Sequence, residues 1–273
     1  MKVLLLNGSS NKNGNTFTTL SEIAKQLEKN GVESEIMQLG NKPVRGCIAC
    51  GQCRAKQLGH CIFDDDVCNR IVEKLNEADA LIVGSPVYYG QPNGAVMAVL
   101  QRAFFSGANV QNKPAASVAI CRRGGATAAY QTLNMIFEMM NMPVVSSQYW
   151  NIAYGMAPGE VSQDTEGMQT MRTLANNMAW LLKKIHANGN HDYPEREEWQ
   201  GMNFIRQIGI YMVRAIGVSN FFSDHLIDLA SNMEIAPMVN QMETHVFNQQ
   251  HDTRKFMEEF STKLMAWAPL AEG

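Results

Sequence analysis

The sequence lacks the features typical of membrane, secreted and nucleic-acid-binding proteins. No apolar run approaches the roughly 18 residues of a membrane-spanning helix. Near the start, only Val3 to Leu6 separate Lys2 from the first polar residue, which is too short for the core of a signal peptide. The formal net charge is only −3, so no charge excess attracts nucleic acid or an anionic membrane. We therefore expect a cytoplasmic protein with no nucleic-acid or membrane partner.

Cysteine is scarce and unevenly distributed. The chain has six cysteines, and four of them fall within fifteen residues, namely Cys47, Cys50, Cys53 and Cys61. Disulfides are rare in a reducing cytoplasm, so we interpret these residues as free or metal-bound thiols. One short loop thus offers the four thiolates that a [4Fe-4S] cluster requires, whereas structural zinc more often takes Cys-x2-Cys pairs from separated segments. The spacing favours a cluster, with reduced and packed thiols as the main alternative and zinc as a weaker one.

Short apolar runs alternate with stretches of helical periodicity over the first 150 residues. This alternation is typical of parallel strands joined by crossover helices. The strands that we predict span residues 2–8, 32–39, 78–86, 113–121 and 142–150. The helices that we predict span residues 16–30, 65–77, 92–106, 125–141 and 164–187. We therefore expect an α/β fold with a doubly wound, five-stranded parallel sheet.

The loop after the first predicted strand, GSSNKNGNT at residues 8–16, is rich in small and hydroxylated residues. In an open parallel sheet, ligands bind beyond the carboxyl ends of the strands, where the strand order reverses. Backbone amides at the start of the following helix attract a phosphate, and Ser9, Ser10, Asn15 and Thr16 can add side-chain donors. The alternative is an ordinary capping turn.

The loop after the third predicted strand is aromatic. Residues 84–96 have the sequence GSPVYYGQPNGAV, in which Pro86 and Val87 precede Tyr88 and Tyr89. A rigid backbone there can offer amides to the edge of a flat ligand while the rings form a wall. A subunit interface would also explain the two tyrosines, because such surfaces are rich in tyrosine.

The loop after the fourth predicted strand combines positive charge with glycine. Residues 121–130 have the sequence CRRGGATAAY, in which Arg122 precedes the pair Gly124 and Gly125. The glycines could close over a flat ring. Arg122 or Arg123 could face a nicotinamide cofactor's phosphate, although most loop arginines are simply solvated.

Residues 1 to about 206 resemble the NAD(P)H-dependent FMN reductase superfamily of flavodoxin-like proteins, and within it the iron-sulfur flavoproteins. The segments that carry the resemblance are GSSNKNGNT, the cysteine cluster followed by DDD, SPVYYGQ, the GG pair, DTEGMQTM at 164–171 and NFIR at 203–206. The resemblance implies FMN with its phosphate on residues 9–16 and its isoalloxazine against residues 86–89 and 122–125. It also implies NAD(P)H as electron donor and a homo-oligomer in which a neighbouring subunit covers the flavin.

Residues 209–273 resemble consecutive pieces of an aldo-keto reductase barrel. The matching segments are VRAIGVSNF at 213–221, APMVNQMETHVFNQQ at 236–250 and LMAWAPLAEG at 264–273. The strands that we predict here span 213–218, 236–243 and 263–268, with helices at 223–233 and 251–262. Three strand-helix units cannot close an eight-stranded barrel, so we expect a βαβαβ fragment of a TIM barrel. The resemblance would put Ser219, Asn220 and Gln241 on the nicotinamide amide and Trp267 against its ring, but the family's catalytic residues have no counterparts.

We predict two domains, a flavodoxin-like FMN-binding domain over residues 1–206 and the incomplete barrel fragment over residues 207–273. The leading hypothesis is an FMN-dependent oxidoreductase that passes electrons from NAD(P)H through FMN to a small acceptor. We predict no catalytic side chain, because a flavin carries out the hydride chemistry itself. The alternatives are an iron-sulfur flavoprotein that carries electrons to redox protein partners, and a non-enzymatic regulatory protein.

Overall fold

The structure is a computed structural model in which the chain forms two compact units, Met1–Glu195 and Arg196–Gly273. The described residues are 1–187, 193–195, 197–198, 200–201, 216–233 and 235–270. The domain boundary that we predict, between residues 206 and 207, lies outside them. No described helix is long and apolar enough to cross a membrane.

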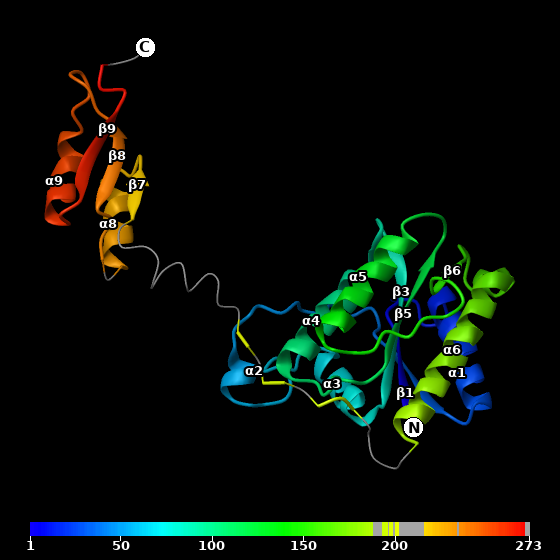
Figure 1. Ribbon diagram of the computed structural model, residues 1–273. Coiled ribbons are helices and arrows are strands. Elements are labelled where there is room, and N and C mark those ends of the chain that lie inside the picture. The colour runs from blue at the N-terminus through cyan, green and yellow to red at the C-terminus, as the bar shows by residue number, and fades with distance from the viewer. Residues whose placement is uncertain (188–192, 196, 199, 202–215, 234, 271–273) are drawn as a thin grey trace. The chain divides into compact units, whose positions relative to one another are not determined.

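The first unit is built on a parallel sheet (Figure 1). Its strand order is β2-β1-β3-β5-β6. Its strands are β1 (Lys2–Asn7), β2 (Glu33–Gln38), β3 (Ala80–Tyr88), β5 (Ala115–Cys121) and β6 (Ile152–Tyr154). A short strand, β4 (Gln91–Pro92), pairs antiparallel with the end of β3. The order reverses between β1 and β3, which confirms the predicted flavodoxin-like, doubly wound fold.

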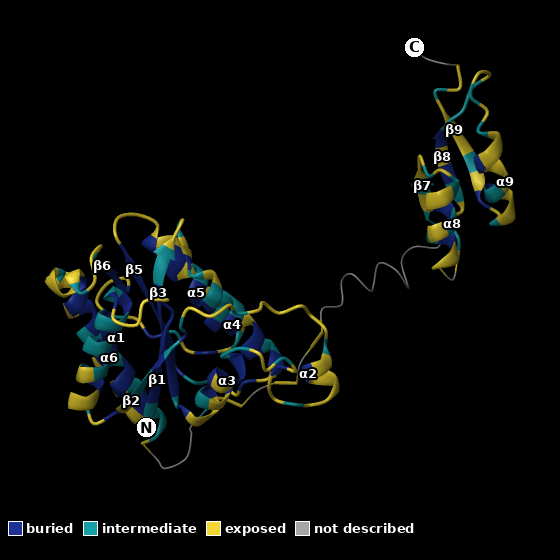
Figure 2. Ribbon diagram, turned by 180° about the vertical axis from the view of Figure 1, so that it is seen from behind, coloured by how far each residue is buried: buried dark blue, intermediate teal, exposed yellow. Residues whose placement is uncertain are grey.

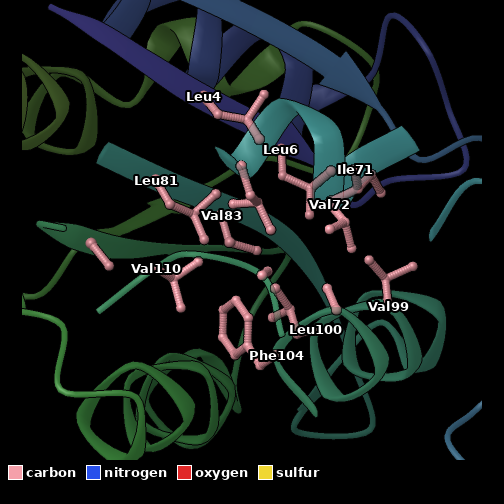
Figure 3. Packing of buried hydrophobic residues seen from close by; sticks show 14 of the residues in the cluster. Leu4, Leu6, Ile71, Val72, Leu81, Val83, Val99, Leu100, Phe104 and Val110 are labelled. Carbon is pink, nitrogen blue, oxygen red and sulfur yellow. The ribbon is translucent and has the colours of Figure 1, made fainter. Parts of the chain in front are cut away.

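Helices cover both faces of this sheet, so the central strands are buried on both sides (Figure 2). One face packs against α1 (Asn15–Lys29) and α6 (Thr165–Ile185), and the other against α3 (Cys68–Glu77), α4 (Gly94–Ser106) and α5 (Ala126–Met139). Side chains alternate along β1, so Val3 and Leu5 join the first core. Leu4 and Leu6 join the second core, which Figure 3 shows.

The strand that we predict over residues 142–150 is wrong. Only an isolated bridge pairs Val144 with Ala115 there, and the last strand of the sheet is β6. Ala119 pairs with Ile152, so four residues along β5 (115 to 119) correspond to eight along the edge segment (144 to 152). The extra residues leave the sheet and carry an exposed Tyr149-Trp150 pair. An apolar pattern cannot reveal this interruption, because it depends on the register with β5.

The second unit is a three-stranded parallel sheet with the order β7-β8-β9. Its elements are β7 (Gly217–Ser219), α8 (Ser223–Ser231), β8 (Val239–Glu243), α9 (His251–Glu259) and β9 (Lys263–Trp267). Leu226, Met242 and Met257 form its small core. The predicted βαβαβ fragment is confirmed, although residues 213–215 of its first predicted strand lie outside the described residues.

Replacing Gly8 by alanine should destabilise the first unit. A Cβ atom there would overlap Cγ2 of Val96 and would lie 2.8 Å from the carbonyl oxygen of Gly84. Overpacking of this kind costs about 1 to 3 kcal/mol. Gly94→Ala is the control, because nothing lies within 4 Å of its Cβ position. Urea unfolding followed by circular dichroism measures both variants, and equal stabilities would contradict this account of Gly8.

Candidate functional site

The β1-α1 loop ends at an uncapped helix start. Gly14 is the N-cap of α1, and no side chain caps the helix. The amide of Thr18 donates to the carbonyl oxygen of Gly14 at 3.1 Å, so the amides of the preceding turn have no partner within the helix. Amides and the positive end of a helix dipole attract anions. This loop can therefore bind a phosphate.

Side chains from two strands hold the β1-α1 loop in place. The amide of Ser9 donates to Oδ1 of Asn7 at 3.1 Å, and Nδ2 of Asn7 donates to Oε1 of Gln38 at 2.6 Å. Nε2 of Gln38 donates in turn to the carbonyl oxygen of Ser9. Neither Asn7 nor Gln38 is among the residues that we predict from the sequence. The available signal was Asn7 itself, a polar residue at the end of an apolar strand.

The four predicted phosphate residues differ in what their side chains do. Oγ of Ser9 already accepts from the amide of Asn11 at 3.1 Å. Oδ1 of Asn15 accepts from the amide of Val161 at 3.3 Å, which ties the β6-α6 loop to the start of α1. Both bonds use acceptor atoms, so Ser9 keeps its hydroxyl proton and Asn15 keeps its Nδ2 group as donors for a ligand. The hydroxyls of Ser10 and Thr16 make no hydrogen bond within the described chain.

The predicted aromatic loop is a tight hairpin between β3 and β4. Tyr89 and Gly90 have φ values of 51° and 75°, as a two-residue hairpin with a type I′ turn requires. This turn leaves Tyr89 fully exposed and Tyr88 half-exposed. At the end of the hairpin, Nδ2 of Asn93 donates to the carbonyl oxygen of Gly8 at 2.7 Å. Asn93, which we did not predict, therefore joins the hairpin to the phosphate loop.

The glycine-containing loop after β5 lies directly against this hairpin. A Cβ atom on Gly125 would be 2.7 Å from Cα of Gly90 and 3.5 Å from Cγ1 of Val87. Arg122 and Gly124 are exposed beside this contact. The structure thus brings the loops after β1, β3 and β5 together at the carboxyl edge of the sheet, where we predict the flavin.

A pocket in the long segment between β2 and α3 is lined by all four clustered cysteines. Cys47 and Cys50 are exposed, whereas Cys53 and Cys61 are buried. Among the described residues, no three His, Cys, Asp or Glu side chains converge as ligands of a single ion. A cluster binds each thiolate at a different iron, so its ligands need not meet at one point. The four thiols around one pocket match this donor set.

The other two cysteines, Cys68 and Cys121, are core residues. Neither Cys68 nor Cys121 lines the pocket. Burial raises the pKa of Cys68 to about 11, so its sulfur stays protonated at neutral pH.

The fold and its carboxyl-edge loops define a flavodoxin-like protein. Its fold is similar to that of an apo NADH:FMN oxidoreductase, with a TM-score of 0.52 at 14% identity over 71% of this chain and 96% of that one. The chain belongs to the NADPH-dependent FMN reductase family, whose model matches residues 1–157.

Relatives of the first unit include two archaeal iron-sulfur flavoproteins. One, from Methanocaldococcus jannaschii, is 32% identical over 194 residues, which cover 68% of this chain and 99% of the relative. Another, from Archaeoglobus fulgidus, is 33% identical over 191 residues, which cover 67% and 92%.

The second unit matches a different family. The aldo/keto reductase model matches residues 183–273. A glyoxal reductase of Bacillus subtilis is 38% identical over 92 residues, which cover 34% of this chain but only 32% of that enzyme. The chain therefore contains a segment of this second family and spans a minor part of the relative that it matches.

Replacing Thr16 by valine should weaken FMN binding while the fold is kept. The change removes one hydroxyl donor and retains the branched shape that packs in α1. One lost hydrogen bond is worth about 0.5 to 1.5 kcal/mol, roughly two- to twelvefold in Kd. Thr18→Val is the control, because the Thr18 hydroxyl donates to Gly14 within the helix at 3.4 Å. Equal Kd values for both variants in a fluorescence titration would place the phosphate elsewhere.

Proposed function

We propose that this protein is an FMN-dependent oxidoreductase that takes electrons from NAD(P)H and passes them to a small acceptor. The observation that supports this proposal best is the meeting of three loops beside an uncapped helix start. FMN, when bound, supplies the hydride and electron chemistry. The chain supplies amides for the phosphate and a hairpin for the ring.

The exposure of this site supports a small-molecule electron donor and a small-molecule electron acceptor. Tyr88, Tyr89 and Arg122 are exposed beside the predicted ring position. An exposed arginine is suited to the phosphates of a nicotinamide cofactor, which it can bind through paired hydrogen bonds. The exposed tyrosines also support our expectation that a second copy of the chain covers the flavin.

The cysteine pocket supports a second candidate function. An iron-sulfur cluster held by Cys47, Cys50, Cys53 and Cys61 would make the protein an electron carrier between redox partners. Two observations favour it, the four thiols around one pocket and the relatives that are named iron-sulfur flavoproteins. Both candidates use the same flavin site. They differ in their electron donor and acceptor, which are small molecules for the reductase and redox proteins for the carrier.

Anaerobic mixing with NAD(P)H separates the two candidates. We expect NAD(P)H to bleach the flavin absorbance at a rate typical of enzyme turnover, about 1 to 1000 per second, because the site is open to a nicotinamide. Bleaching only after addition of a reduced redox protein would favour the carrier.

A chain truncated after residue 206 tests whether the second unit takes part in flavin reduction. A fall of more than about tenfold in its rate, roughly 1.4 kcal/mol, at equal FMN occupancy would show that this unit serves the nicotinamide.

Anaerobically purified protein should contain about four iron and four sulfide per chain if the four thiols bind one cluster. Cys50→Ser should lower this content, because it removes one ligand from the pocket. Cys121→Ala should leave the iron content unchanged, because Cys121 lies on β5 and does not line the pocket. Zinc, or no metal, in the anaerobic protein would refute the cluster.

A further inference from the structure

The most deeply buried charge in the described chain lies beside the cysteine pocket. Arg102 of α4 is only 1% exposed, although its guanidinium stays charged. A buried charge is costly unless it is paired and hydrogen-bonded. Its guanidinium contacts the carboxylate of Asp66, and it donates to the carbonyl oxygens of Arg45 at 3.1 Å and Phe63 at 3.0 Å.

These contacts close the base of the cysteine loop. Arg45 precedes the first cysteine of the cluster, and Phe63 follows the last one. The carboxylate of Asp66 also accepts from the amides of Arg45 at 3.1 Å and Cys68 at 2.9 Å. Burial opposes ionisation here, but these hydrogen bonds hold the pKa of Asp66 below its ordinary value. A single ion pair thus fastens both ends of the loop to α4.

One donor of Arg102 is left over. Nε of Arg102 is buried and has no hydrogen-bond partner in the described chain. The side chain lines the same pocket as the four cysteines. Among the other side chains of the lining, Ile48, Ile62, Phe63 and Phe105 are apolar, so only the Ser106 hydroxyl and the four thiols can accept a hydrogen bond. Four of these five acceptors are cysteine sulfur atoms.

We propose that Arg102 is a positioning residue for an iron-sulfur cluster, closing the cysteine loop and donating the Nε hydrogen bond to a cluster sulfur. This role rests on the cluster proposed above. Hydrogen bonds to the sulfur atoms tune the reduction potential of such clusters. A hydrogen bond of this kind favours the reduced, more negative state, so Arg102 raises the potential.

Arg102→Lys tests this role in the full-length, anaerobically reconstituted protein. Lysine keeps the charge but loses the planar fork and the Nε donor. Redox titration followed by electron paramagnetic resonance should show a more negative cluster potential. We expect about a tenfold smaller reduction constant, which is 59 mV for one electron. Arg70→Lys is the matched control, because Arg70 lies exposed on α3, and it should leave the potential unchanged.

A single Arg102→Met change would leave the buried carboxylate of Asp66 without its partner and could unfold the protein. The double variant Arg102→Met, Asp66→Asn avoids this, because it removes both buried charges together. FMN binding reports that it is folded. It should lose iron to a chelator at least about tenfold faster than the native protein. A potential and a release rate equal to those of the native protein would overturn the role of Arg102. Native protein without iron would refute the cluster itself, and with it this role.

Discussion

Burial of β1 on both faces is the constraint on which the first unit depends. Val3, Leu4, Leu5 and Leu6 are all fully buried, so neither face of β1 carries a polar side chain along these four residues. The polar residues of β1 lie at its two ends, and Asn7, at the carboxyl end, begins the network that holds the phosphate loop. The strand order reverses beside this same strand, which leaves space there for a ligand.

Much of the fold could be predicted because its signals are local. Apolar runs located β1, β2, β3 and β5, and helical periodicity located the main helices to within a few residues. The edge strand could not be located, because its position depends on pairing with β5. The candidate loops were also predictable, since glycine and hydroxylated residues follow predicted strands. The residues that hold these loops in place could not be predicted. Gln38, Asn93 and Arg102 act through partners that are distant in sequence.

The second unit has a small hydrophobic core and a sheet of its own within a segment that matches the aldo/keto reductase family. Its core residues Leu226, Met242 and Met257 all come from the segment itself, and its strands pair in parallel. Met265, on β9, is half-exposed. Nε1 of Trp267 donates to Oδ1 of Asn220 at 3.0 Å, so the side chains expected at a nicotinamide satisfy one another.

Helix α4 is a common support for both candidate centres. Its N-cap, Asn93, is bonded to the phosphate loop, and Arg102 lies further along the helix at the cysteine pocket. The rise from residue 94 to residue 102 is about 12 Å along the helix axis. An α-helix changes length far less easily than a loop changes shape. The helix therefore fixes the separation of its two ends, and the electron-transfer distance between a flavin and a cluster would be set by its backbone geometry.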